Sequence, residues 1–322
     1  MIALWVAASL LTGPAPQPDC TPQQMQQVLQ PTDAPLRLTC SVRLSEGQSI
    51  TRPLLLEGAQ ASRTVIDCQG GTLGREGRAV TTSRPTVGIW SRKTSDSTSG
   101  GVWERPTDIT IRNCRIIGNV RIWGMGSDGS YDDLRQSSRQ AGHIERAQAA
   151  APARIRLEDL TITGRGSIPL YVGPGATEVS LTGSTLNGTT TATAIYLDAE
   201  SARNRITGNR ILTRTGREKI AVDGSAYNRI TDNRFDLQGR PGIFLYRNCG
   251  ERAVIRHQTP SHNTITGNAF TGASWLRPRL VVENARNGRR AYCGADAGYP
   301  FGSSIDNRDN ATGNTISANR SS

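Results

Sequence analysis

The stretch that decides the fold runs from Asn204 to Asn233, where Asn204-Arg-Ile-Thr-Gly-Asn209 is followed by Asn228-Arg-Ile-Thr-Asp-Asn233. The unit returns as Asn263-Thr-Ile-Thr-Gly-Asn268 and as Asn314-Thr-Ile-Ser-Ala-Asn319. Units 24 residues apart at first, and 35 and 51 residues apart later, indicate a solenoid with loops inserted between coils. Such a coil buries its apolar side only against the coils above and below it.

The repeated asparagine predicts a ladder at one corner of the coil. An inward Asn can hydrogen-bond to its neighbours in both directions along the stack. The same corner traces back through Ser184 and Leu160 to Cys114 and Cys68. The fold class we expect is therefore all-β, a single-stranded right-handed parallel β-helix over residues 20–322.

The N-terminus supplies a cap and a leader. In Thr21-Pro22-Gln23-Gln24, Thr at the N-cap, Pro at N1 and Gln at N3 predict a short helix that covers the first coil. Residues 1–19 are expected to be a signal segment, because the apolar run from Met1 to Thr12 is too short to span a bilayer. The run lacks a positive flank, and a buried core segment is the alternative interpretation.

The net charge and the cysteines narrow the expected class of binding partner and the expected cellular compartment. The net charge of +11 is almost all arginine, which suits either a polyanionic partner or a GC-rich genome. No helix-turn-helix, zinc-finger or aromatic RNA-binding signature is present, so an acidic glycan is expected rather than nucleic acid. Six cysteines without C-x-x-C spacing favour an oxidising compartment, either secreted or periplasmic. We also expect a monomer whose mature chain has no membrane span. The expected pairs are Cys20–Cys40 and Cys249–Cys293, with Cys68 and Cys114 stacked inside the coil, bridged or free.

A second strand in each coil predicts the functional face. Seven segments align by their apolar pairs: Val87–Trp90, Val120–Trp123, Ile168–Tyr171, Ile195–Asp198, Ile220–Asp223, Ile243–Tyr246 and Leu280–Glu283. If the first and third residues point inward, the fourth ones form an outward column of Trp90, Trp123, Tyr171, Asp198, Asp223, Tyr246 and Glu283. Aromatic rings suit stacking on sugars, and carboxylates suit catalysis or cation binding. A merely solvated face is disfavoured, because three adjacent aromatics would form an exposed apolar patch.

Cations and long insertions flank this column. Lys219 and Arg279 each lie four residues before a column carboxylate, and Arg247 directly follows Tyr246. Residues 125–153, 247–262 and 284–303 are insertions of the kind that often carries function. We expect Asp223, Asp198, Arg247, Lys219, Tyr246 and Glu283 to form the catalytic centre, and Trp90, Trp123, Tyr171, Tyr196, Arg279 and His257 to bind substrate.

The four Asn units, with the phrases VIDCQGGTL (65–73) and ITIRNCRIIG (109–118), resemble the pectate-lyase-like right-handed β-helix superfamily over about residues 35–320. That resemblance implies the fold and leaves the substrate open. Residues 218–247 are also similar to the chondroitinase-B and alginate-lyase family. Glu218 and Arg247 match its Glu and Arg, whereas Asp223 stands where its catalytic Lys would be, and Lys219 could substitute. The resemblance to pectate lyases implies that Asp198 and Asp223 hold Ca²⁺ beside Arg247 as the base.

Two reactions fit these residues. One is β-elimination on a uronate polymer, which needs carboxylate neutralisation, a base and an acid. The other is hydrolysis or transglycosylation by paired carboxylates, because Asp198 and Asp223 on adjacent coils would lie roughly 5 Å apart and Asp223 and Glu283 nearer the inverting range of roughly 6.5–9.5 Å. We expect an acidic-polysaccharide lyase first, with a hydrolase, an epimerase and a non-catalytic carbohydrate-binding protein as alternatives.

Overall fold

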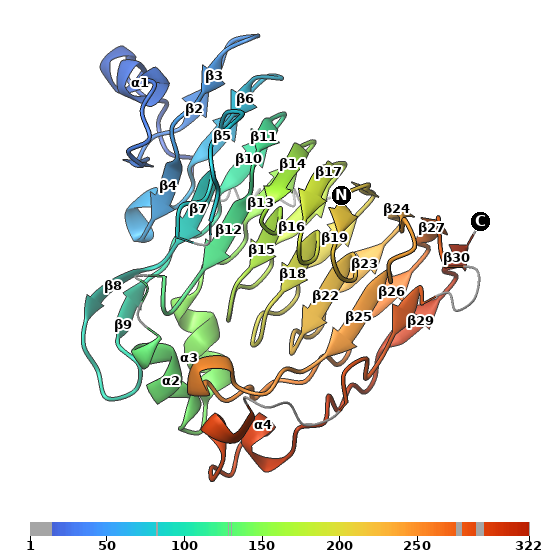
Figure 1. Ribbon diagram of the computed structural model, residues 1–322. Helices are drawn as coiled ribbons and strands as arrows, with labels where there is room; N and C mark the ends of the chain where they lie inside the picture. The colour runs from blue at the N-terminus through green and yellow to red at the C-terminus, as the bar shows by residue number, and fades with distance from the viewer. Residues whose placement is uncertain are drawn as a thin grey trace, which may run out of the picture.

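The computed structural model describes residues 15–81, 83–127, 129, 131–274, 279–287 and 293–321. Within these residues the strands stack into three long parallel sheets, as expected for a parallel β-helix (Figure 1). Sheet one comprises β1 (Leu36–Arg37), β4 (Leu54–Glu57), β7 (Val87–Trp90), β12 (Val120–Trp123), β15 (Leu170–Val172), β18 (Ile195–Leu197), β22 (Ile220–Asp223), β25 (Ile243–Tyr246) and β28 (Val281–Val282).

The other two sheets follow the same stacking order. Sheet two comprises β2 (Val42–Arg43), β5 (Val65–Asp67), β10 (Thr110–Arg112), β13 (Arg156–Glu158), β16 (Ser180–Thr182), β19 (Arg205–Thr207), β23 (Arg229–Thr231), β26 (Thr264–Thr266) and β29 (Thr315–Ser317). Sheet three comprises β3 (Ser49–Ile50), β6 (Thr72–Leu73), β11 (Arg115–Ile117), β14 (Thr161–Gly166), β17 (Thr185–Thr190), β20 (Arg210–Ile211), β24 (Arg234–Asp236), β27 (Ala269–Thr271) and β30 (Arg320–Ser321), with β21 (Arg214–Thr215) beside β17.

The core is a stack of aliphatic side chains along the axis. In sheet two, for example, Leu181, Ile206 and Ile230 occupy equivalent positions on β16, β19 and β23 and are fully buried. Alternation along each strand turns the residues on either side of them outward. The thin core therefore requires only one or two large apolar residues per strand, which explains the low hydrophobic content.

Two asparagine ladders run along the corners, where the repeats predicted one. In one, the Nδ2 of Asn209 donates to the Oδ1 of Asn233, and the Nδ2 of Asn233 donates to the Oδ1 of Asn268, both at 3.0 Å. The other ladder joins Asn204, Asn228, Asn263 and Asn314 in the same way. The predicted continuation through Ser184 is also present, since its hydroxyl accepts from the Leu160 backbone at 3.0 Å.

The N-terminal end is capped and cross-linked. Helix α1 (Pro22–Leu29) has the predicted capping box between Thr21 and Gln24, and the predicted Cys20–Cys40 disulfide holds it to the first coil. Of the predicted leader, residues 1–14 lie outside the described residues, while the Gln17 backbone donates to the Arg63 carbonyl at 3.0 Å. No helix in the described ranges combines the length and apolar character needed to cross a bilayer.

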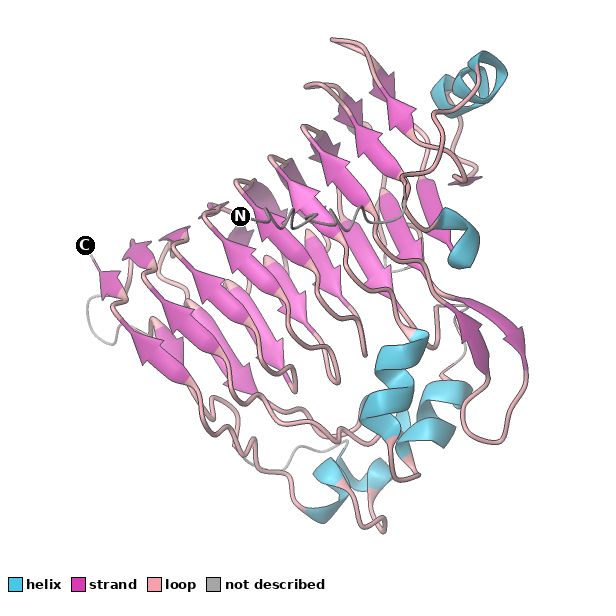
Figure 2. Ribbon diagram, turned by 180° about the vertical axis from the view of Figure 1, so that it is seen from behind, coloured by secondary structure: helices cyan, strands magenta, loops and turns pink. Residues whose placement is uncertain are grey.

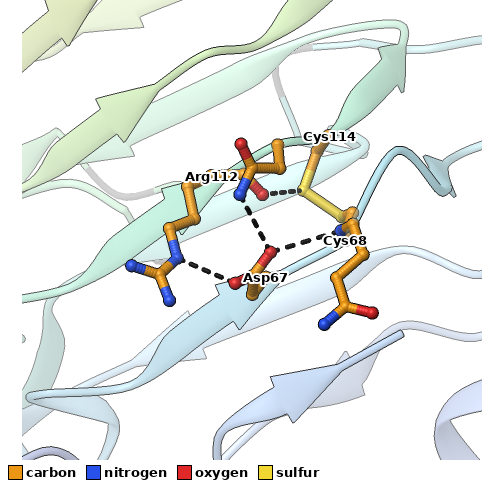
Figure 3. Close-up of a disulfide and its surroundings, with 6 residues drawn as sticks. Asp67, Cys68, Arg112 and Cys114 are labelled. Atoms are coloured by element: carbon orange, nitrogen blue, oxygen red, sulfur yellow. Dashed lines mark hydrogen bonds and ion pairs between the residues drawn. A yellow bond between two sulfur atoms is a disulfide. The ribbon is translucent and has the colours of Figure 1, made fainter. Parts of the chain in front are cut away.

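A second disulfide joins adjacent coils (Figure 3). Cys68 and Cys114, left open by the sequence as bridged or free, form a bond in the buried corner. Beside it, Asp67 accepts from Arg112 at 2.9 Å and from the Asn113 amide at 3.1 Å. The two coils are therefore tied covalently and by hydrogen bonds. Cys249 is also disulfide-bonded, and the side chain of its predicted partner at position 293 lies outside the described residues.

The insertions gather along one edge of the solenoid, beyond the carboxyl ends of the sheet-one strands (Figures 1 and 2). They hold the β8–β9 hairpin (Arg92–Ser95, Val102–Glu104), α2 (Asp132–Ser138), α3 (His143–Ala150), and α4 (Gly302–Ile305). Short 3-10 turns at Ala59–Ala61, Glu251–Ala253 and Cys293–Asp296 complete the elements. The 125–153 insertion, expected as a loop, thus folds into two helices.

Candidate functional site

A cleft of about 810 Å³ lies over the outer face of sheet one. Its floor is built from β12, β15 and β18, which contribute Arg121, Trp123, Tyr171 and Tyr196, followed by Asp198. The insertions build its wall: Ser138 on α2 accepts from the Ile255 backbone at 3.0 Å, and Arg256 donates from its backbone to Ser303 at 3.0 Å. The site therefore combines a rigid floor with a wall of mutually braced loops.

An aromatic row forms the floor, as the outward column predicts in part. The rings of Trp123 and Tyr171 are 6.0 Å apart, and those of Tyr171 and Tyr196 are 5.8 Å apart. Trp90 is paired in register with Trp123 but lines a separate cavity of about 620 Å³. Its indole lies over Gly88, where a Cβ atom would meet the ring at 3.0 Å.

The register of β15 differs from the prediction. Tyr171 pairs with Arg121 and Tyr196, two residues away from the predicted alignment with Trp123 and Asp198. The segment starts at Leu170 rather than Ile168 because a period of two permits a slip of two residues without changing which side chains face inward. Tyr171 and Tyr196 therefore form their own outward column, two residues before the carboxylates along the strands.

This shift creates two tyrosine–aspartate pairs. The hydroxyl of Tyr171 donates to Asp198, and the hydroxyl of Tyr196 donates to Asp223 at 2.5 Å. Burial, and then the nearby carboxylate, raises the pKa of each phenol well above its ordinary value. Both tyrosines are neutral proton donors at neutral pH, each oriented by a carboxylate.

Asp223 is withdrawn beneath the floor rather than exposed on it. Its side chain is 0% exposed and accepts from the Asn248 backbone at 2.7 Å and the Asn248 amide at 2.6 Å. Burial raises its pKa; Asp198 adds to this effect, while Arg256 opposes it. The predicted catalytic Asp223 is therefore placed to orient Tyr196 and Asn248, which both line the cleft.

Asp198 does line the cleft, and it is ion-paired. Arg256 donates to its Oδ1 at 2.5 Å, and the Ala199 backbone donates to the same oxygen at 2.8 Å. Burial disfavours the charge of Arg256, but Asp198 and Asp223 outweigh burial and hold the pKa of Arg256 well above its ordinary value. Arg256 therefore lies between the two acids and is ion-paired with Asp198.

Glu200 is a second acid at the cleft, and the prediction missed it. It is 1% exposed, and its two oxygens accept from the backbones of His257 at 2.7 Å and Gln258 at 3.0 Å. Burial raises its pKa to about 7, against the opposing effects of these bonds and of Arg256. A carboxyl that titrates near neutral pH suits proton transfer. The sequence could have indicated Glu200, because this acid lies two residues after Asp198 and just beyond β18.

Tyr246 is buried beside the cleft rather than exposed in it. Its hydroxyl donates to Glu218 at 3.2 Å and accepts from Arg217 at 2.8 Å, and the Arg286 guanidinium lies 3.8 Å from its ring centroid. Burial raises the pKa of Tyr246 well above its ordinary value. Tyr246 therefore supports two arginines that line the cleft, Arg217 and Arg286.

The two predicted catalytic cations point elsewhere. The Lys219 ammonium is buried and donates to the Thr213 carbonyl at 2.5 Å, and burial lowers its pKa to about 8. Arg247 donates to the Asp306 carboxylate and to the Arg308 carbonyl, both at 2.8 Å, because the segment 306–309 packs over it. Neither lines the cleft, which corrects their predicted place beside Asp223.

Three more predicted residues lie outside the cleft. β25 pairs with β28 at Val281, so Glu283 follows the end of the strand, is exposed, and accepts from Asn314 at 2.8 Å. Arg279 is exposed, with its guanidinium 4.4 Å from the Phe244 ring centroid. His257 braces the wall: its Nε2 lies 2.6 Å from the Ser138 carbonyl.

The carboxylates do not fit a calcium ion. No group of three or more His, Cys, Asp or Glu in the described ranges could hold a metal. Both predicted ligands have their oxygens engaged by donors: Asp198 by Arg256 and Tyr171, and Asp223 by Tyr196 and Asn248. The guanidinium of Arg256 thus contacts Asp198 where the resemblance to pectate lyases would place Ca²⁺.

The family model of the right-handed beta helix region matches residues 100–319, which is more than half of the chain. The chain belongs to this right-handed β-helix family. Searches of curated proteins and of solved structures find no match. Family membership confirms the fold, including its hand, and the pectate-lyase-like superfamily is consistent with it; the narrower likeness of residues 218–247 to chondroitinase B is not supported.

Positive charge dominates the lining of this β-helix cleft. Two acids, Asp198 and Glu200, face six arginines: Arg121, Arg165, Arg217, Arg252, Arg256 and Arg286. Because low-dielectric walls concentrate the field of such groups, the cleft attracts anions. The arginine content alone could not locate this cluster, since its members come from five separate segments of the chain.

Proposed function

We propose that this protein cleaves an acidic polysaccharide by β-elimination in the sheet-one cleft. The observation that carries the proposal is the lining of six arginines and two acids over an aromatic floor. Aromatic rings supply faces for sugars, and guanidinium groups bind carboxylates in a two-pronged geometry. A neutral glycan would leave this concentration of charge without a role.

Elimination needs a cation that neutralises the sugar carboxylate, so that the proton on C5 becomes acidic. Arg217 and Arg286 lie on the cleft side of Tyr246, where they share Glu218 at 2.8 Å and 3.0 Å. With two guanidinium groups on one carboxylate, a net positive charge remains for substrate. These two arginines are our candidates for binding the reacting uronate.

Proton transfer then divides between two groups. Glu200, with its pKa raised to about 7, accepts the C5 proton, and the Tyr196 hydroxyl donates its proton to the glycosidic oxygen on C4. The electron pair of the broken C5–H bond forms the C4=C5 double bond as the C4–O bond breaks. Asp223 keeps the phenol oriented, and exchange of protons with solvent restores both groups.

Hydrolysis is the second candidate, favoured by one observation. Asp198 is ion-paired with Arg256, whereas burial raises the pKa of Glu200 to about 7, and two carboxyls with different environments are typical of acid and base pairs. Here Glu200 would protonate the leaving oxygen, and Asp198 would activate water or attack the sugar. Asp223, the predicted partner of Asp198, does not line the cleft and is therefore not assigned either role.

The pH dependence separates the two reactions, because they require opposite forms of Glu200. Elimination requires the carboxylate, so activity should rise as pH increases through about 7. Hydrolysis requires the acid, so activity should fall over the same range. We would incubate the protein with polygalacturonate, alginate, chondroitin sulfate, dextran and xylan, and measure ultraviolet absorbance of unsaturated ends alongside total reducing ends. Cleavage of only the neutral polymers would contradict the proposal.

A further inference from the structure

Arg121 differs from the other arginines of the cleft. It lies in the middle of β12, in register with Gly88 on one side and Tyr171 on the other. Its side chain faces outward into the cleft floor, yet the residue is only 3% exposed. The charge is therefore held deep in the site rather than at its rim.

Its guanidinium has aromatic neighbours in place of an acid. Among the described residues it makes no ion pair, and its buried Nε has no hydrogen-bond partner. The Tyr171 ring centroid lies 4.1 Å from the guanidinium carbon and the Trp123 centroid 5.5 Å away. Four other cleft arginines are paired, with Glu76, Glu218 or Asp198.

A second donor points to the same place. The indole Nε1 of Trp123 is buried and has no hydrogen-bond partner among the described residues. Burying a charge and a polar N–H without partners is costly, and binding of an anion is one way in which such groups are completed. Burial lowers the pKa of Arg121, and the Asp198 carboxylate opposes this effect without forming an ion pair with it.

We infer that Arg121 and Trp123 form an anion-recognition subsite, which binds a carboxylate or sulfate on a sugar unit next to the one that reacts. The guanidinium fork would hold the two oxygens of the anion, and the indole N–H and the ring faces would contact the sugar. The inference rests on the proposed binding of an acidic polysaccharide in this cleft. It adds that substrates are selected by a second anionic group, distant from Tyr196.

The test is binding of short defined oligosaccharides by calorimetry. Galacturonate oligomers, sulfated chondroitin oligomers and neutral xylo-oligomers would be compared on wild type, Arg121→Met and Arg229→Met. Arg229 is an exposed arginine on β23, so its variant is a control for the same charge change. For Arg121→Met we expect at least about a tenfold loss of affinity for the anionic oligomers and no change for neutral ones. Unsulfated chondroitin oligomers are added to distinguish the two anions, because they keep the carboxylates of the sulfated oligomers and lack the sulfates. Tighter binding of the sulfated oligomers by wild type identifies sulfate, and equal binding identifies carboxylate.

Stability provides the second readout. Arg121 has no ion pair to lose, and removal of a buried charge offsets the loss of its contacts with the Tyr171 and Trp123 rings. Arg121→Met should therefore melt at about the same temperature as wild type or higher, so weaker binding could not be attributed to misfolding. Equal affinity of Arg121→Met and wild type for the anionic oligomers would overturn the inference, as would binding of none of them by wild type. If Arg121→Met binds the anionic oligomers more weakly but wild type cleaves none of them, the subsite inference stands and only the lyase proposal is contradicted.

Discussion

Replacing Tyr196 with Phe removes one oxygen atom from the floor of the cleft and leaves the ring in place. That oxygen donates to Asp223 at 2.5 Å, and the Asn248 amide lies 3.3 Å from it. Asp223 would keep two donors, both from Asn248. A hydrogen bond to a charged group contributes about 1.5–3 kcal/mol, so the free energy of unfolding should fall by about 2 kcal/mol.

The expected loss of activity is much larger than this loss of stability. If the phenol protonates the leaving oxygen, Tyr196→Phe should lower kcat by about a hundredfold or more, the range of one positioned acid or base. Asp223→Asn should lower kcat comparably, because Asp223 acts through the orientation of Tyr196. The two residues are in contact, so the double variant should be little worse than either single one.

The assay is initial-rate formation of unsaturated product from whichever acidic polymer wild type cleaves, with urea unfolding in parallel. Tyr171→Phe is the matched control, since the same atom is removed one coil away, where it donates to Asp198. We expect it to affect activity less than Tyr196→Phe. Tyr196→Phe with more than half of wild-type kcat, or multiplicative effects of Tyr196→Phe and Asp223→Asn, would refute the reasoning.

Three further predictions concern Glu200 and the scaffold. Because burial raises the Glu200 pKa to about 7, the folded state loses stability as pH rises from the ordinary carboxyl range through 7. The difference in unfolding free energy between wild type and Glu200→Gln should therefore change by up to about 3 kcal/mol over this range. Parallel pH curves of the two proteins would contradict the raised pKa. Asn233→Ala breaks bonds to Asn209, Ile206 and Asn268, so urea unfolding should show a loss of about 3 kcal/mol or more, and a loss below about 1 kcal/mol would count against the ladder. Replacing Cys68 and Cys114 with Ala opens a cross-link that spans 46 residues, which should cost about 4 kcal/mol, and unchanged stability would show that the coils need no covalent tie.

The fold was predictable because its determinants are local and repeated. Four coils present asparagine at the same corner, and these four copies of Asn-x-Ile-x-x-Asn suffice to align that corner of the stack. The capping box at Thr21 is likewise confined to four residues. Such features depend on neighbours at a fixed spacing, so the sequence contains them in full.

The site was predictable only in outline, because insertions and register decide it. The column correctly brought Trp123, Tyr171 and Asp198 into one cleft, but a period of two could not distinguish Leu170 from Ile168 as the start of β15. Whether Asp223 faces substrate depends on Asn248, which comes from an insertion without periodicity. Arg256, the partner of Asp198, is 58 residues away along the chain, and no local pattern marks it.

The mass of the products from a defined acidic oligosaccharide tests the central claim most directly. Elimination breaks the chain without adding water, so the two product masses should sum to that of the substrate, and formation of the pair should increase as pH rises through about 7. Products whose masses sum to the substrate plus one water, formed faster below that pH, would contradict elimination and establish hydrolysis. An oligosaccharide that wild type binds but leaves intact would show that the cleft is a binding site alone.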